Sequence, residues 1–230
     1  MQGGRVLLRG IFVTGTDTNV GKTLVSAALM RRYRQLAVRY WKPIQTGIEQ
    51  DNDTAEVERL SACTADRVLQ AGVRLPRRVS PHLAAKLTGS PIDIESLVTI
   101  ANSQTGAWIV EGAGGLLVPL TEQVLLIDLI GRLQLPLMPV LIVARSGLGT
   151  INHTLMTIEV LTRRALPIAG IVMVGPRNDL ARENRTAIEH YGRIPVLGEL
   201  PVLSPLTPEA LGEWTDEHLD RDGHLMEWLR

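Results

Sequence analysis

The residues best suited to chemistry lie in one segment, Gly15-Thr16-Asp17-Thr18-Asn19-Val20-Gly21-Lys22-Thr23, which directly follows an apolar run. A glycine-bearing loop between a strand and a helix exposes backbone N–H groups that can surround phosphate oxygens, and the helix start adds its positive dipole end. Lys22 would supply a mobile charge for the β- and γ-phosphates, and the Thr23 hydroxyl is placed to reach Mg²⁺. The segment therefore predicts a phosphate-binding loop; a strand-to-helix turn that merely contains glycines is the alternative.

The spacing of this loop differs from the common pattern. In G-x-x-x-x-G-K-[ST] the first glycine would fall at Thr16, whereas here it is Gly15, so the loop is one residue longer. The residues that we expect to bind the nucleotide are Thr18, Asn19, Val20, Gly21, Lys22 and Thr23.

A second lysine, Lys42, stands at the end of another predicted strand, in Trp41-Lys42-Pro43-Ile44-Gln45-Thr46-Gly47. Pro43 ends the strand and Gly47 permits a tight turn, so Lys42 and Thr46 can face one small volume beside the phosphate loop. An ammonium group there would neutralise charge that develops during phosphoryl transfer. The alternative is an ordinary strand-end lysine, which the neighbouring phosphate loop disfavours.

Two carboxylates are candidate ligands for Mg²⁺. Glu111 follows the apolar run Trp108–Val110, and the glycines after it, Gly112 and Gly114, would let the backbone approach phosphates. Asp53 opens a helical segment and is either a helix N-cap or a metal ligand; the spacing does not separate these two roles.

A third polar segment, Gly149-Thr150-Ile151-Asn152-His153, follows a predicted strand and begins a helix. Its free N–H groups could hold a carboxylate or a phosphate. Hydrogen bonding at the helix start is the alternative for Asn152 and His153. The basic residues Arg74, Arg77 and Arg78 are expected in a solvated surface loop.

Six short runs rich in Val, Ile and Leu recur without alternating polarity, as expected of parallel strands covered on both faces. They are Val6–Val13, Val38–Trp41, Trp108–Val110, Leu137–Ala144, Ile168–Val174 and Val196–Leu200. Between them, amphipathic segments predict helices at Leu24–Leu36, Ala55–Ser61, Ile94–Ala101, Val124–Leu133, Ile151–Arg163 and Ala181–His190. The alternation predicts an α/β fold, a doubly wound and mainly parallel sheet with helices on both faces. Ligands bind at the carboxyl ends of such strands, where the first three motifs stand.

Length, charge and cysteine content limit the kinds of protein that this chain can be. The 230 residues predict a single domain, 1–230, with 204–230 as a loosely specified C-terminal appendage. Lysine plus arginine equals aspartate plus glutamate at 24 each, so no overall charge favours nucleic acid or an anionic membrane. Cys63 is the only cysteine, no signal peptide is indicated, and the longest apolar segment, 135–144, is too short to span a bilayer. A cytoplasmic protein is expected.

Together these segments resemble one family. The elongated phosphate loop, the Lys42–Gly47 and Glu111–Gly115 segments, Ser80-Pro81-His82, Gly149–His153 and Leu197-Gly198-Glu199-Leu200-Pro201 are similar, in this order, to those of dethiobiotin synthetases, which are P-loop NTPases. The resemblance covers about Gly10 to Pro201. It implies a homodimeric, ATP-dependent enzyme of biotin biosynthesis, a ligase that makes carbon–nitrogen bonds.

The reaction implied by the resemblance is the closure of a ureido ring. The amine of 7,8-diaminononanoate takes up CO₂ or bicarbonate as a carbamate, the carbamate attacks the γ-phosphate of ATP, and the second amine closes the ring to give dethiobiotin, ADP and phosphate. By position, Lys42 matches the catalytic lysine, Lys22 the phosphate-loop lysine and Thr46 a substrate-contacting hydroxyl. The resemblance also makes Thr23, Asp53 and Glu111 the Mg²⁺ ligands, Pro201 a nucleotide contact, and Gly149, Thr150 and Asn152 substrate contacts near the subunit boundary.

The chain departs from the family at one nucleotide contact. The family often places asparagine, which contacts adenine, where this chain has Val174-Gly175-Pro176; Asn178 is a candidate substitute. The principal alternative function is a ParA/MinD-like regulatory ATPase. Those proteins usually carry an additional lysine early in the phosphate loop, and Gly15 to Asn19 contains none.

Overall fold

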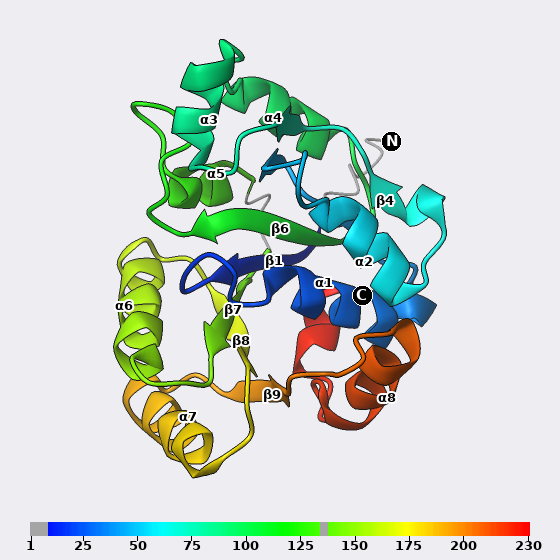
Figure 1. Cartoon of the computed structure of the whole chain (residues 1–230), viewed down its shortest axis with the longest axis vertical. Helices are drawn as coiled ribbons and strands as arrows, with labels where there is room; N and C mark the ends of the chain where they lie inside the picture. Colours follow the sequence, from blue (N-terminus) through cyan, green and yellow to red (C-terminus); the bar gives the residue numbers. More distant parts are fainter. Residues whose placement is uncertain (1–8, 134–137) are drawn as a thin grey trace, which may run out of the picture.

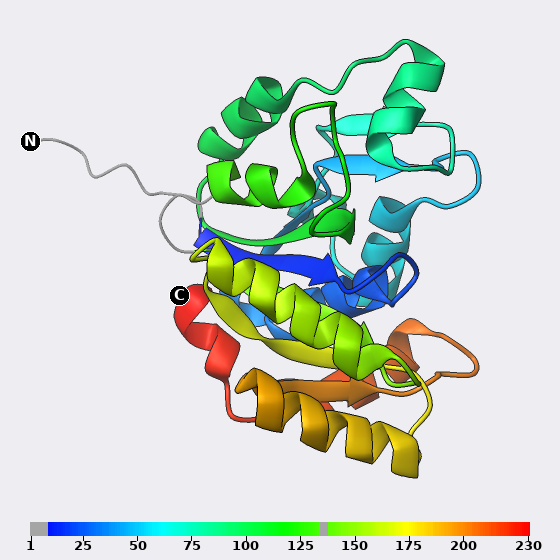
Figure 2. The same ribbon diagram turned by 90° about the vertical axis from the view of Figure 1, so that its left-hand side faces the viewer.

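The computed structural model describes residues 9–133 and 138–230, in which a seven-stranded parallel sheet lies between two layers of helices (Figures 1 and 2). The strand order is β4-β2-β6-β1-β7-β8-β9, and every neighbouring pair is parallel. The strands are β1 (Arg9–Gly15), β2 (Arg39–Trp41), β4 (Val68–Leu69), β6 (Ala107–Gly115), β7 (Val140–Arg145), β8 (Ile168–Val174) and β9 (Val196–Leu200). The predicted α/β class is thus confirmed. The first three residues of the predicted strand at Val6 and the first residue of the one at Leu137 lie outside the described residues.

The helices form two apolar cores, one on each face of the sheet. Alternate side chains of β1 enter opposite cores, Phe12 one of them and Ile11 and Val13 the other, as the period of a strand requires. The helices that contribute to the Phe12 core are α3 (Pro81–Thr88), α4 (Ile94–Asn102), α5 (Leu126–Leu133), α6 (Thr150–Arg163) and α7 (Asp179–Gly192). Those of the opposite core are α1 (Lys22–Arg32), α2 (Asp53–Ser61) and α8 (Pro208–His218).

Several elements differ from the predictions. The β6 strand does not stop at Val110: its pairing with β1 continues to Gly115, so Glu111 lies within a central strand. A separate two-stranded sheet, β3 (Ile44–Thr46) with β5 (Val73–Leu75), was not predicted, because strands of three residues give too short a pattern. Helix α1 ends at Arg32 and is followed by a short 3-10 helix. No helix among the described residues combines the length and apolar character needed to cross a membrane.

The C-terminal segment is packed into the molecule and is not a loosely specified appendage. Helix α8 packs against α1 and α2, and a 3-10 helix, His224–Trp228, follows it. The segment buries five large side chains in the core that contains α1, namely Leu211, Trp214, Leu219, Leu225 and Leu229. Its apolar residues therefore hold the helix that follows the phosphate loop.

A buried carboxylate, Asp220, fastens this segment to the end of α1. It is 1 % exposed, accepts hydrogen bonds from the backbone N–H groups of His224 and Leu225 at 2.9 Å each, and accepts a third from the hydroxyl of Tyr33. Arg32 donates to its backbone carbonyl at 3.2 Å. The carboxylate therefore starts the last helix and ties it to α1.

Replacing Tyr33 with phenylalanine should lower the free energy of unfolding by about 1–3 kcal/mol, because a buried carboxylate loses one of its donors. Urea denaturation of the two proteins measures the difference. The ring and its packing remain, so an unchanged denaturation midpoint would show that the hydroxyl does not secure the C-terminal segment.

Candidate functional site

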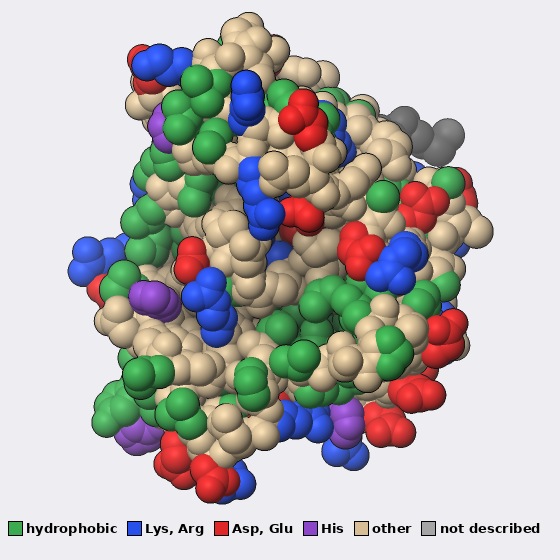
Figure 3. Space-filling model, in the orientation of Figure 1, with side chains coloured by type: hydrophobic (Ala, Val, Ile, Leu, Met, Phe, Trp, Pro, Cys, Tyr) green, Lys and Arg blue, Asp and Glu red, His purple; other side chains and the backbone are tan. Residues whose placement is uncertain are grey.

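A pocket of about 550 Å³ lies at the carboxyl ends of the central strands. In Figure 3, which views this face of the molecule, the central hollow has basic and acidic side chains around it. The lining joins segments far apart in the sequence: Thr18, Asn19, Gly21, Lys22, Thr23, Lys42, Thr46, Asp51, Asp53, Arg78, Val79, Ser80, Pro81, Glu111, Ala113, Gly114 and Val118. The three motifs at strand ends therefore meet in one cavity, as their positions predict.

The phosphate loop has the backbone that its glycines suggest. Gly21 has φ of 99° immediately before α1, a left-handed conformation that glycine adopts at no steric cost, and a side chain there would collide with Val174 at 2.9 Å. The loop is held from outside by Arg145, whose guanidinium donates to the Thr18 carbonyl at 3.0 Å and lies 3.2 Å from the Asp17 carboxylate. Arg145 therefore holds the loop in place from outside. The loop leads directly into the start of α1, where free N–H groups favour an anion.

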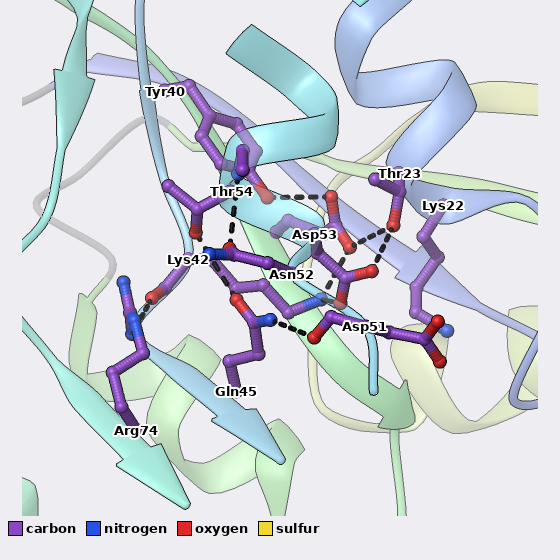
Figure 4. A network of polar contacts seen from close by, with 12 residues as sticks. Lys22, Thr23, Tyr40, Lys42, Gln45, Asp51, Asn52, Asp53, Thr54 and Arg74 are labelled. Atoms are coloured by element: carbon purple, nitrogen blue, oxygen red, sulfur yellow. Dashed lines mark hydrogen bonds and ion pairs between the residues drawn. The ribbon is translucent and has the colours of Figure 1, made fainter. Parts of the chain in front are cut away.

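Lys42 is the centre of a buried charged cluster (Figure 4). Its Nζ lies 2.6 Å from Asp53 Oδ2 and 2.6 Å from Glu111 Oε1. The Thr23 hydroxyl lies 3.1 Å from Asp53 Oδ1 and 3.1 Å from Glu111 Oε1. One ammonium, one hydroxyl and two carboxylates, from four separate segments, thus share a single position at the pocket floor.

The carboxylates keep Lys42 charged despite its burial. Burial alone would lower the pKa of Lys42, but the charges of Glu111 and Asp53 and their hydrogen bonds outweigh it and raise the pKa above its usual value. For Asp53 burial acts in the opposite sense, and the Lys42 charge prevails and lowers the pKa. The cluster is therefore ionic: a cation between two anions.

Lys22 behaves differently, because among the described residues it has no carboxylate partner at salt-bridge distance. Its Nζ donates to the carbonyl of Asp17 at 3.1 Å, and burial followed by the nearby charge of Lys42 lowers its pKa to about 8. A fraction of Lys22 is thus neutral in mildly alkaline solution. A polyphosphate beside it would favour the charged form and raise this pKa.

ATP affinity should therefore fall as pH rises above about 8. Below that value Lys22 already carries its proton, whereas above it binding must take up a proton, so affinity decreases by up to about tenfold per pH unit. Calorimetry at pH 8.5 in buffers of different ionisation enthalpy measures the uptake. Lys22→Arg should remove the pH dependence of ATP affinity, since arginine keeps its charge. If the ATP affinity of the wild type does not change between pH 7 and pH 9, the lowered pKa of Lys22 does not control binding.

The structure shows that Asp53 is not the N-cap of its helix. Asn52, not Asp53, is the N-cap of α2, because its side-chain oxygen accepts a hydrogen bond from Ala55 N at 3.1 Å. Asp53 is the first residue of the helix, and its carboxylate faces Lys42 and Thr23. Asp53 is therefore not the helix cap; its carboxylate lines the pocket, where it pairs with Lys42.

Two residues behind the pocket make contacts that the sequence did not predict. Tyr40, fully buried on β2, donates from its hydroxyl to Glu111 Oε2 at 2.9 Å; burial and the charge of Glu111 raise its pKa well above the usual value, so it remains a donor. Arg74 belongs to β5 and donates to the Lys42 carbonyl at 2.9 Å, so it does not lie in a solvated loop. The only signal for Tyr40 was its place two residues before Lys42 in an apolar run.

The other predicted residues divide into two groups. Thr46 and Gly114 line the pocket, whereas Val20 is buried in the core beside α1 and Gly112 packs against Phe12 and Leu126. The residues that do not line the pocket also include Gly149, Thr150, Asn152 and Pro201.

Gly149 is the N-cap of α6, and the Thr150 hydroxyl lies 3.4 Å from that of Thr154. At the end of β8, the amide oxygen of Asn178 accepts a hydrogen bond from Ala181 N at 2.9 Å and caps α7. The Asn178 side-chain oxygen therefore has a structural role. Contacts of Gly149, Thr150, Asn152 and Pro201 with a ligand stay predictions.

Comparisons with known proteins show the family to which the chain belongs. A family model described as an AAA domain matches residues 9–210. The ATP-dependent dethiobiotin synthetase BioD of Paramagnetospirillum magneticum is 50 % identical over 204 residues, which cover 89 % of this chain and 93 % of the relative. The match therefore spans nearly the whole of both proteins.

Solved structures show the same fold at low identity. The septum site-determining protein MinD of Pyrococcus horikoshii, complexed with Mg-ADP, has a TM-score of 0.54 at 15 % identity and covers 95 % of this chain and 93 % of its own. A ParA family ATPase of Chlorobium tepidum has a TM-score of 0.53 at 12 % identity, with 97 % and 96 % covered. These likenesses concern the fold alone, whereas the identity to BioD is far higher. The chain therefore belongs to the family of ATP-dependent dethiobiotin synthetases, ligases of biotin biosynthesis.

Proposed function

We propose that the pocket around Lys42 joins CO₂ to 7,8-diaminononanoate and closes the ureido ring of dethiobiotin at the expense of ATP. One amine adds to CO₂ and loses a proton to give a carbamate. A carbamate oxygen then attacks the γ-phosphorus and ADP leaves. The second amine attacks the carbamoyl carbon and loses a proton, the carbon–oxygen bond to phosphate breaks, and the ring and inorganic phosphate are released.

The observation that carries this proposal is the pair of lysines on one cavity. The carbamate and the triphosphate are both anions and repel each other, so their approach needs positive charge between them. Lys22 stands in the phosphate loop and Lys42 at the end of β2, and both line the pocket. Catalysis of phosphoryl transfer is mostly positioning and charge stabilisation, which two fixed ammonium groups supply.

We further propose that Thr23, Asp53 and Glu111 hold Mg²⁺. Their oxygens fit this ion, because Mg²⁺ is usually held by one or two carboxylates together with hydroxyl, water and phosphate oxygens. The Thr23 hydroxyl lies 3.1 Å from each carboxylate, so the three side chains already converge. When bound, Mg²⁺ would neutralise charge on the phosphates; Lys42, which pairs with the same two carboxylates, would then be free to turn toward the carbamate.

The part of the pocket lining that does not belong to the phosphate loop is suited to the diamine. It includes Thr46, Ser80, Pro81 and Val118, which combine two hydroxyls with apolar surface. We propose that Thr46 contacts the substrate, whose chain is apolar and whose amines can donate hydrogen bonds.

We propose that the enzyme is a homodimer in which the start of α6 serves the partner's pocket. Gly149, Thr150 and Asn152 lie outside the pocket of their own chain, yet a helix start is suited to a carboxylate such as the one that the substrate carries. Leu148 is 93 % exposed beside them, which an interface would explain. The single cysteine, Cys63, suits the reducing cytoplasm, where we expect the enzyme to act.

The product assay tests the proposal. Purified protein is incubated with Mg²⁺, ATP, ¹³C-bicarbonate and 7,8-diaminononanoate, and we expect dethiobiotin with the label in its ring carbonyl, formed in equal amount to ADP. The control omits the diamine. If no dethiobiotin forms and ATP hydrolysis instead requires a protein or DNA partner, a ParA/MinD-like regulatory ATPase is the better reading.

A further inference from the structure

The Tyr40 hydroxyl lies directly behind the carboxylate that faces the pocket. Tyr40 stands on β2 opposite Ile109 of β6, and its side chain is 0 % exposed, as is that of Glu111. Its hydroxyl donates to Glu111 Oε2 at 2.9 Å (Figure 4). A tyrosine in this place therefore does more than fill the core.

The two oxygens of Glu111 have separate partners. Oε1 is reached by Lys42 Nζ at 2.6 Å and by the Thr23 hydroxyl at 3.1 Å, both of which line the pocket. Oε2 is reached from the core side by Tyr40. Glu111 Oε2 is therefore bound on the core side by the Tyr40 hydroxyl, and Oε1 faces the pocket.

This assignment matters because a glutamate carboxylate turns easily. Rotation about its last torsion has a broad, twofold profile, so the side chain alone does not choose which way its oxygens face. A fully buried carboxylate also loses stability when one oxygen lacks a donor. Since the Tyr40 ring is held by the sheet, its hydroxyl is a fixed point that sets the plane of the carboxylate.

We propose that Tyr40 is a positioning residue that holds the Glu111 carboxylate in the orientation needed to bind the divalent cation of the nucleotide complex. The inference rests on the proposed role of Glu111 in holding Mg²⁺. Tyr40 itself touches neither nucleotide nor cation: it acts through Glu111, as outer hydrogen-bond partners of metal ligands do.

The test measures binding without turnover. The affinity for AMP-PNP, an ATP analogue that is not hydrolysed, is determined by calorimetry once with Mg²⁺ and once with EDTA, for wild type and Tyr40→Phe. We expect the gain in affinity due to Mg²⁺ to fall roughly tenfold in Tyr40→Phe. The affinity in EDTA should stay within about twofold, because the phosphate loop and Lys22 are untouched.

Tyr33→Phe is the matched control. It also removes a buried hydroxyl that donates to a buried carboxylate, Asp220, but Asp220 does not line the pocket. It should lose stability and keep the full effect of Mg²⁺. Equal losses of the Mg²⁺ effect in both variants would make the role of Tyr40 merely structural and would overturn the inference.

Glu111→Gln separates this inference from the proposed function. If Mg²⁺ no longer raises the AMP-PNP affinity of Glu111→Gln but still raises that of Tyr40→Phe, the proposed cation site is supported and the proposed role of Tyr40 is wrong. If Glu111→Gln keeps the effect, the proposed cation site itself is wrong and the inference falls with it. If both lose it, the double variant should be no worse than Glu111→Gln alone, since both act on one ligand.

Discussion

Replacing Lys42 with methionine is expected to lower kcat by roughly 10²–10³-fold or more, the loss typical of one preorganised charge at a transition state. The ammonium is buried, stands between two carboxylates and has a raised pKa, so it is a permanent positive charge at the pocket floor. The measurement is the steady-state formation of dethiobiotin. Wild-type kcat in the variant would show that β2 does not supply the catalytic charge.

The same substitution should lower stability, which separates the two roles of Lys42. Removing the cation leaves Glu111 and Asp53 without their shared partner, and the loss of one member of a buried ion pair costs about 3–5 kcal/mol. Denaturation by urea measures this effect. Lys86→Met is the matched control: Lys86 is the third of the three lysines, is exposed on α3, and should tolerate the change in both assays.

Glu111→Gln is expected to lower kcat about as much as Lys42→Met does. The Glu111→Gln protein should nevertheless be more stable than the Lys42→Met protein. The substitution keeps the shape of the side chain but removes the charge that anchors Lys42 and the proposed ligand of Mg²⁺. Lys42 still has Asp53 at 2.6 Å, so no buried ammonium is left unpaired. Dethiobiotin formation and urea denaturation measure the two effects.

A double-mutant cycle sharpens this prediction. Lys42→Met with Glu111→Gln removes both charges, so it should recover part of the stability lost in Lys42→Met while remaining inactive. Glu56→Gln is the control, because Glu56 pairs with Arg59 at 2.6 Å on the exposed surface of α2 and should change neither stability nor kcat measurably. If the double variant is as unstable as the sum of the single ones, Lys42 and Glu111 are not coupled.

The sequence predicted where Lys22 and Thr23 lie at the strand ends, because the information for these two residues is local. A strand, a glycine-bearing loop and a helix start are adjacent in the chain, and Lys22 and Thr23 follow from that order alone. The three segments that end at the same edge of a parallel sheet had to meet there, which placed Lys42 and Glu111 beside the loop. That meeting is what the pocket lining confirms.

The sequence was less informative where a residue's role depends on its neighbours in space. Asp53 could cap a helix or face the pocket, and only the use of Asn52 as the cap separated these. The prolines and charged residues of 204–230 predict a loosely specified segment, whereas Leu211, Trp214 and Leu225 are buried in the core that contains α1. Short strands such as β3 and β5 exist only because they pair with each other.

By itself, then, the sequence predicted the α/β class, the phosphate loop, the second lysine and the family, since each rests on the order and spacing of residues along the chain. Tertiary structure alone decided that Lys42 stands between two carboxylates, that Asp53 is free of helix capping, and that Tyr40 lies behind Glu111. The reason is physical: hydrogen bonds and ion pairs depend on distances of a few ångströms between segments that are far apart in the chain, as Tyr40 and Glu111 are, 71 residues apart. No local pattern encodes those distances.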